Sequence, residues 1–311
     1  MCDLALMAGE SDPLKSHTPS RPSSNDGLWV QKLQAFRASH IQRIGSAHAQ
    51  LWPYFLGGQG EHVILALHGS HSDGESLFSL VGPLEQTCRV LTPTYPAGVT
   101  SMLALVDGLA TLLDMLELPP AIVVGYSLGG YVAQALAWRH PHRVAGLALL
   151  HTGAPARSSA RSAALQNALL AATPASLLNA GAQAGASIMM ALESPGLERD
   201  AARFWRGYLA QVARRTGKER MREHGRLVVD FLSGRVSAAH DAPIGSHQKT
   251  LIVEGELDRT IEPSERRALH LRYPEAVRVV NILAGHLSAL TRPAPYLAAI
   301  TDTFLATSAT D

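Results

Sequence analysis

The chain has 311 residues, a formal net charge of +1 and an apolar fraction of 46%. The near-neutral charge argues against wholesale nucleic-acid binding, and the apolar fraction argues against a chain that stays disordered throughout. Cys2 and Cys88 are the only cysteines. Two cysteines are too few for a disulfide framework, which fits a reducing cytoplasm. A chain of this length buries about three quarters of its unfolded surface, so a large core is available.

Residues 1–26 are rich in Ser, Pro, Asp and Lys, and they contain neither a basic leader nor a continuous apolar run. We interpret them as a mobile N-terminal tail. No stretch of the sequence reaches the ~20 apolar residues that are needed to cross a bilayer. We therefore expect a cytoplasmic protein without a membrane span.

Helical and extended patterns alternate through the first half of the chain. Apolar residues at helical spacing predict a short amphipathic helix over residues 27–40, and an antiparallel hairpin is predicted over 40–55. Apolar strands follow over residues 62–67, 88–91, 121–125 and 143–150, with helices over 102–118 and after residue 127 up to Trp138. Strands that alternate with helices imply parallel crossover units, hence an α/β sheet covered on both faces.

Residues 154–245 break this alternation, since they are alanine-rich and contain no convincing strand. Helices are predicted there over residues 164–172, 175–192, 197–215 and 219–232. Strands resume over 250–253 and 277–283, with helices over 263–273 and 293–306. The expected architecture is a mostly parallel sheet flanked by helices, with a core of residues 27–153 and 246–311 and a helical cap of residues 154–245.

The segment Gly125-Tyr126-Ser127-Leu128-Gly129 joins a buried strand to a helix at an abrupt turn. This pattern predicts a nucleophile elbow, in which a serine hydroxyl stands above the sheet edge. Glycines at 125 and 129 relieve crowding beside the strained corner. The free N–H groups at the start of the helix favour a developing negative charge.

A serine hydroxyl is a weak nucleophile at neutral pH, so it needs a base and a third group that orients this base. In an open parallel sheet these partners belong beyond the carboxyl ends of the strands. Asp258 follows a glycine turn after the strand at 250–253, where Glu254 and Glu256 are weaker competitors. His286 lies just beyond the last strand. The order serine, aspartate, histidine predicts a catalytic triad of Ser127, His286 and Asp258.

An oxyanion hole would complete such a site. The backbone N–H of Leu128 is one expected donor, because Leu128 directly follows the nucleophile. Ser70, after His68-Gly69, is the expected second donor, with Gly69 or His71 as the alternatives. We interpret the side chains of His68 and Ser70 as structural.

With these motifs, the chain resembles the α/β-hydrolase-fold serine hydrolases over residues 40–311. Within that superfamily, Leu91-Thr-Pro-Thr-Tyr-Pro and the elbow are distantly similar to maspardin-like proteins, some of which are thought to act as binding proteins. Retention of all three triad positions argues against a binding-only protein. A serine at position 127 also separates the chain from haloalkane dehalogenases, whose nucleophile is an aspartate.

The leading hypothesis is hydrolysis of an ester, thioester or lactone through an acyl-enzyme, which requires no metal or organic cofactor. The same triad also serves carbon–carbon bond hydrolysis, epimerase-like side reactions and perhydrolysis. A non-catalytic module that binds a ligand or a partner is the alternative outside enzymes. It would use the basic helical region formed by Arg199, Arg203, Arg206, Arg214, Arg215, Arg220, Arg222 and Arg226.

The cap also carries large apolar residues, which are Met189, Met190, Phe204, Trp205, Tyr208 and Phe231. At helical spacing such residues more often pack against the sheet than line a pocket. A pocket closed by a lid nonetheless needs apolar walls, so a minority should face an acyl or alkoxy group. The expected partner is therefore a small, moderately hydrophobic substrate.

Overall fold

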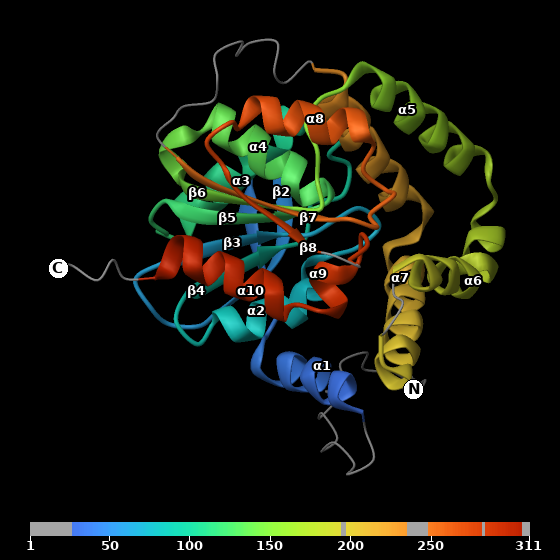
Figure 1. Ribbon diagram of the computed structural model, residues 1–311, viewed down its shortest axis with the longest axis horizontal. Coiled ribbons are helices and arrows are strands. Elements are labelled where there is room, and N and C mark those ends of the chain that lie inside the picture. The colour runs from blue at the N-terminus through green and yellow to red at the C-terminus, as the bar shows by residue number, and fades with distance from the viewer. Residues whose placement is uncertain (1–26, 194–196, 235–247, 282–283, 307–311) are drawn as a thin grey trace, which may run out of the picture.

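The computed structural model describes residues 27–193, 197–234, 248–281 and 284–306 (Figure 1). The predicted tail, residues 1–26, and the last part of the predicted cap, residues 235–245, lie outside the described residues. No helix in the described part of the chain is long and apolar enough to cross a membrane.

The strands of the described residues form one eight-stranded sheet in the order β1-β2-β4-β3-β5-β6-β7-β8. The hairpin β1–β2 is antiparallel, β2 is antiparallel to β4, and all other neighbours are parallel. The predicted mostly parallel α/β sheet is thereby confirmed. The bounds are β1 (Arg43–Ala47), β2 (Gln50–Gly57), β3 (Val63–Leu67), β4 (Arg89–Pro93), β5 (Ala121–Tyr126), β6 (Val144–Leu150), β7 (Lys249–Gly255) and β8 (Val277–Asn281).

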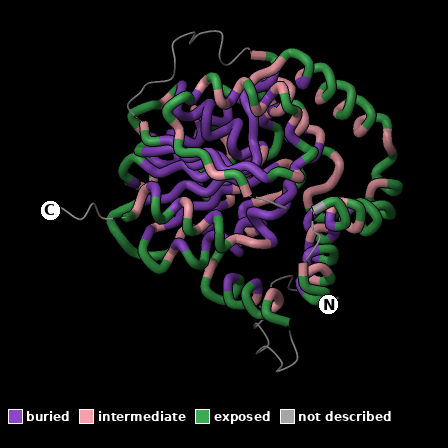
Figure 2. Tube along the Cα trace, viewed as in Figure 1, coloured by how far each residue is buried: buried purple, intermediate pink, exposed green. Residues whose placement is uncertain are grey.

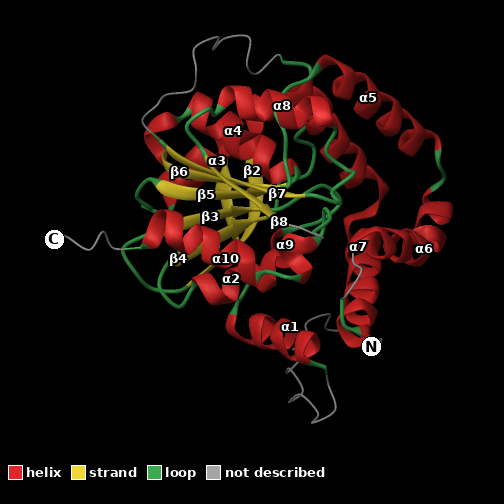
Figure 3. Cartoon of the chain, in the orientation of Figure 1, coloured by secondary structure: helices red, strands yellow, loops and turns green. Residues whose placement is uncertain are grey.

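Helices cover both faces of this sheet (Figures 1 and 3). One face carries α3 (Met102–Met115), α4 (Leu128–Arg139) and α8 (Pro263–Arg272), and the other carries α2 (Phe78–Leu84), α9 (Ser288–Thr291) and α10 (Ala294–Ile300). Each face packs its own apolar cluster. Every residue of β3 and β5 is buried, because both faces of these strands are covered (Figure 2).

Three helices lie between β6 and β7, and we call them the insertion helices. They are α5 (Arg157–Ala172), α6 (Ala175–Glu193) and α7 (Arg199–Leu232). Figure 1 shows them as an arch beside the carboxyl ends of the strands. Gly217 has a positive φ of 71° inside α7 and separates two helical segments, where the sequence predicted two helices. The second segment packs Leu227, Phe231 and Leu232 into the cluster on the α3–α4 face of the sheet.

Several elements differ from the sequence-based expectation, among them α9, which was not predicted. Helix α2 was not predicted, because Gly82 and Pro83 in its short sequence obscure a helical pattern. The predicted closing helix over residues 293–306 is divided into α10 and a following π-helical turn, Thr301–Leu305. Helix α1 (Leu28–Ser39) forms as predicted and buries Leu33 and Phe36 against the body.

Candidate active site

Ser127 occupies the corner between β5 and α4 in a strained backbone conformation, with φ 56° and ψ −119°. The flanking glycines permit this corner. A Cβ atom at Gly125 would lie 2.4 Å from the carbonyl oxygen of Gly129, and a Cβ atom at Gly129 would lie 2.1 Å from that of Leu67. Side chains at either position would therefore force the strand and the helix apart.

The structure brings Ser127, His286 and Asp258 into one chain of hydrogen bonds. His286 Nε2 lies 2.9 Å from Ser127 Oγ, and His286 Nδ1 lies 3.0 Å from Asp258 Oδ2. An ionised carboxylate only accepts hydrogen bonds, so His286 Nδ1 carries the proton and Nε2 is free to accept the serine proton. The three side chains come from the loops after β5, β7 and β8, as the sequence predicted.

Asp258 is held by donors on both carboxylate oxygens. Oδ1 accepts a hydrogen bond from the backbone N–H of Thr260 at 2.9 Å, and the backbone carbonyl of Asp258 accepts one from Arg266. Burial alone would raise the pKa of Asp258. The hydrogen bonds that Oδ2 accepts from His151 and His286 outweigh burial and hold this pKa well below its usual value. Asp258 is therefore a fixed, ionised acceptor.

Both predicted oxyanion donors lie beside Ser127. Leu128 begins α4, where a backbone N–H lacks an intrahelical partner. The loop of Gly69 and Ser70 lies against the elbow, since a Cβ atom at Gly69 would be 3.2 Å from Ser127 Cβ. The N–H of His71, an alternative donor, already donates to His224 Nδ1 on α7 at 3.0 Å. This contact favours the N–H of Ser70 over that of His71.

The side chain of His68 is structural, as interpreted from the sequence. It is fully buried, with Nδ1 2.8 Å from the carbonyl oxygen of Gly69, and its Nε2 accepts from the N–H of Tyr95 at 3.3 Å. Burial lowers the pKa of His68 to about 4, so the imidazole is neutral at pH 7.

A cavity of about 710 Å³ extends from Ser127 and His286 beneath the insertion helices. Its walls are mostly apolar, and the insertion contributes Leu170, Leu177, Leu178, Ala182, Ala186, Met189, Leu209 and Val212. Of the six large apolar residues noted in the sequence, Met189 lines this cavity. Trp205 and Tyr208 pack against Phe78, and Phe231 stacks on Tyr131.

Ion pairs occupy part of the basic helical region on α7. Arg215 pairs with Asp73 at 2.6 Å and with Glu75 at 2.8 Å, while Arg222 pairs with Glu219 at 3.0 Å. Arg215 thus connects α7 to the segment that follows the loop of Gly69, Ser70 and His71.

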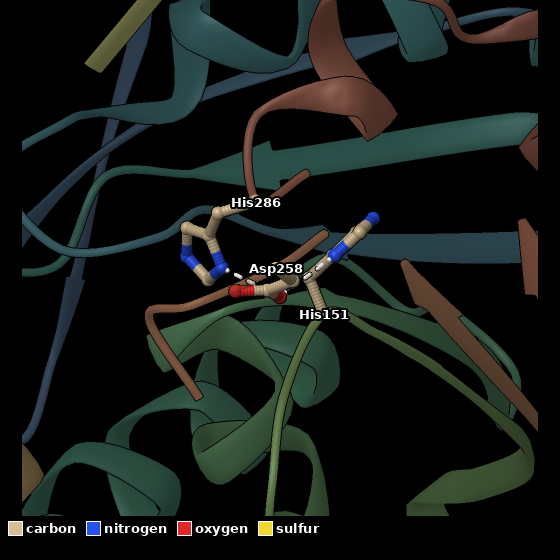
Figure 4. A group of neighbouring side chains, drawn as sticks. All are labelled: His151, Asp258 and His286. Atoms are coloured by element: carbon tan, nitrogen blue, oxygen red, sulfur yellow. Dashed lines mark hydrogen bonds and ion pairs between the residues drawn. The ribbon is translucent and has the colours of Figure 1, made fainter. Parts of the chain in front are cut away.

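Sequence reasoning missed a second imidazole on Asp258. His151, directly after β6, places Nδ1 2.9 Å from Asp258 Oδ2. Figure 4 shows His151 and His286 approaching the carboxylate from different sides. A signal was available, because His151 also directly follows a buried strand and so lies at the same sheet edge as Ser127.

His151, Asp258 and His286 are also residue types that bind metals, and their ligand atoms lie within 4.8 Å of one another. Both Nδ1 atoms, however, face the same carboxylate oxygen at hydrogen-bond distance. Two N–H donors on one anionic acceptor account for this arrangement. We therefore interpret the group as a hydrogen-bonded cluster.

A model of the alpha/beta hydrolase family matches residues 63–299, and the chain belongs to this family. Membership supports a hydrolase. A comparison with curated proteins gave no match.

Solved structures share the fold. A hydrolase from Pseudomonas aeruginosa PA01 is similar with a TM-score of 0.68 and 22% identity, over 85% of this chain and 98% of that chain. The enol-lactonase from Burkholderia xenovorans LB400 has a TM-score of 0.68 and 20% identity, over 85% and 100% of the two chains. A thermophilic esterase from Thermogutta terrifontis has a TM-score of 0.66 and 22% identity, over 84% and 97%. At these identities the likeness shows the fold alone.

Proposed function

We propose that the protein is a serine hydrolase that cleaves a carboxylic ester, thioester or lactone through an acyl-enzyme. The observation that carries this proposal is the hydrogen-bond chain from Ser127 Oγ through His286 to Asp258. Ser127 attacks the substrate carbonyl, and His286 Nε2 takes the serine proton and gives it to the leaving alcohol or thiol as the acyl-enzyme forms. A water molecule then attacks the acyl-enzyme, and His286 takes the water proton and returns it to Ser127 Oγ as the acid is released. Asp258 keeps His286 in the required tautomer and stabilises the imidazolium.

The tetrahedral intermediate carries a negative charge on the former carbonyl oxygen. The backbone N–H groups of Leu128 and Ser70 are the proposed donors to this oxygen, in a site that the insertion helices shield from bulk water. The mostly apolar cavity supports a moderately hydrophobic acyl or alkoxy group, with the scissile carbonyl at Ser127.

Hydrolysis of p-nitrophenyl esters by the wild type and by Ser127→Ala tests this proposal. We expect the variant to lose turnover by a factor on the order of 10⁴ or more, because it lacks the hydroxyl that is hydrogen-bonded to His286. Ser46→Ala is a matched control, since Ser46 is exposed on β1. Equal turnover by wild type and Ser127→Ala would refute the proposal.

A further inference from the structure

His151 is built into the sheet edge behind the proposed triad. It is 1% exposed, and its backbone has a positive φ of 48°, a conformation that a non-glycine residue adopts at a cost. Its ring occupies space that a side chain at position 255 would fill, since a Cβ atom at Gly255 would lie 2.7 Å from His151 Cε1. The backbone conformation after β6 and the glycine at the end of β7 thus both accommodate this imidazole.

Hydrogen bonds fix the orientation and the tautomer of His151. Nδ1 donates to Asp258 Oδ2 at 2.9 Å, because the ionised carboxylate can only accept. Nε2 is then an acceptor, and it lies 2.6 Å from Tyr296 Oη on α10 and 3.1 Å from Ser288 Oγ on α9. Ser288 Oγ donates its one proton to the carbonyl oxygen of Gly285 at 2.6 Å, one residue before His286, so Tyr296 Oη is the donor to Nε2. Hydrogen bonds of His151 and Ser288 therefore reach the proposed triad both at Asp258 and at the loop that carries His286.

We infer that His151 is a positioning residue for the proposed hydrolysis: it shares Asp258 Oδ2 with His286 and thereby fixes both the angle and the basicity of the triad carboxylate. This inference rests on the proposed function. Backbone N–H groups of Thr260 and Ile261 already hold Oδ1, at 2.9 and 3.4 Å. His151 and His286 both donate to Oδ2, so the direction in which Oδ2 faces His286 is set jointly by the two imidazoles. Each donor also stabilises the anion, so the second donor weakens the hold of Asp258 on a protonated His286.

Several charged and titratable groups lie around His151, Asp258 and His286. Three groups surround Asp258. His286 lies on the loop after β8 and His151 directly follows β6. Arg266 lies on α8, and its Nη2 is 4.0 Å from Asp258 Oδ1. The neutral Tyr296 lies beyond His151. Glu262 and Glu265 line the cavity together with His286. Burial lowers the pKa of His151, which favours the neutral imidazole as the donor to Asp258. Replacing His151 removes one donor to Asp258 and changes none of these other residues chemically.

Two variants distinguish the effect of the His151 N–H donor from the effect of the space that the imidazole fills. His151→Asn retains an N–H donor near the position of Nδ1, and His151→Leu fills similar space without a donor. For each we would measure the pH profile of kcat/KM for a p-nitrophenyl ester. In parallel, the histidine titrations would be followed by NMR on isotope-labelled protein, with His286→Gln to assign the resonance of His286. The NMR arm needs no catalytic activity.

In His151→Leu we expect the pKa of His286 and the acidic limb of kcat/KM to rise together by about 0.5–1 unit, because the carboxylate becomes more basic. Loss of restraint should also lower the plateau kcat about 10- to 100-fold. His151→Asn should restore most of both values. A purely structural role would lower stability and leave the titration of His286 unmoved, and that result, or equal values for Asn and Leu, would overturn the inference. Absence of Ser127-dependent turnover in the wild type would instead refute the proposed function, while the NMR titration would still test His151.

Discussion

The two sides of the cavity are built in different ways. On the sheet side, Ser127, Asp258 and His286 extend from strand ends and are joined by hydrogen bonds of 2.9 and 3.0 Å. On the other side, α5 and α6 expose most of their surface (Figure 2), and Ser159 is the buried residue of α5. Under the proposed function, the sheet fixes the chemistry, whereas helices with few constraints from the core select the substrate.

Helix α7 is part of the insertion, but its second segment also packs against the sheet side of the cavity. Before Gly217, Trp205 and Tyr208 pack with Phe78 over α2. After Gly217, His224 accepts a hydrogen bond from the N–H of His71, and Phe231 stacks on Trp138 of α4. The second segment therefore acts as part of the sheet side, although the sequence assigned it to the cap.

The largest effect should come from changing the carboxylate on the sheet side. Asp258→Asn should lower kcat by a factor on the order of 10⁴, because the amide can donate to His286 and favour the wrong tautomer. Steady-state kinetics with an aryl ester provide the measurement. Glu256→Gln is the control, since Glu256 is an exposed carboxylate in the same turn. Comparable losses in both variants would argue against the assigned role.

Acid should destabilise the sheet side through its buried neutral histidines. The folded-state pKa of His68, about 4, lies below the ordinary value of 6.5, so its contribution to stability is complete above pH 6.5 and is lost as the pH falls toward 4. This loss amounts to about 3 kcal/mol for a fully buried group. Urea unfolding at pH 7 and 4.5 should show a weaker pH dependence in His68→Asn. An unchanged dependence would contradict the burial argument.

The second segment of α7 should matter for turnover although it lies far from the triad in sequence. His224→Leu removes the acceptor of the His71 N–H and should lower kcat about 10- to 100-fold, because the loop that carries the proposed Ser70 donor loses this hydrogen bond. KM should change less than kcat. His142→Leu is the control, since His142 is an exposed histidine near the other end of the strands. An unaltered kcat in His224→Leu would show that α7 does not support the loop of Gly69, Ser70 and His71 during turnover.

The smallest effect should come from the insertion side, and it should depend on the substrate. Gly185 lines the cavity, and a Cβ atom there would meet nothing within 4 Å. Gly185→Leu should lower kcat/KM for long-chain esters about 10-fold while acetate esters are turned over normally. Gly207→Leu on α7 is the matched control, because Gly207 is exposed and also has open space. A uniform loss for all esters would contradict the division between the two sides.

Much of the sheet side could be predicted from sequence because its signals are local. Buried apolar strands, the glycines around Ser127 and the polar residues after β7 and β8 each follow from a few adjacent residues. His151 was missed because a histidine after a strand acquires meaning only when β6 and β7 pair, which places it beside Asp258. Helix periodicity likewise located α5–α7 but did not show that, of the six large apolar residues noted in the sequence, Met189 alone lines the cavity.

The central claim is that Ser127 is the activated nucleophile of the sheet side. Peptide mass spectrometry after reaction with a fluorophosphonate probe tests it most directly. The account predicts one adduct on Ser127 of the native protein, its loss after denaturation before labelling, and strongly slowed labelling in His286→Gln. A native protein that stays unmodified, or that carries the adduct on another residue, would contradict it.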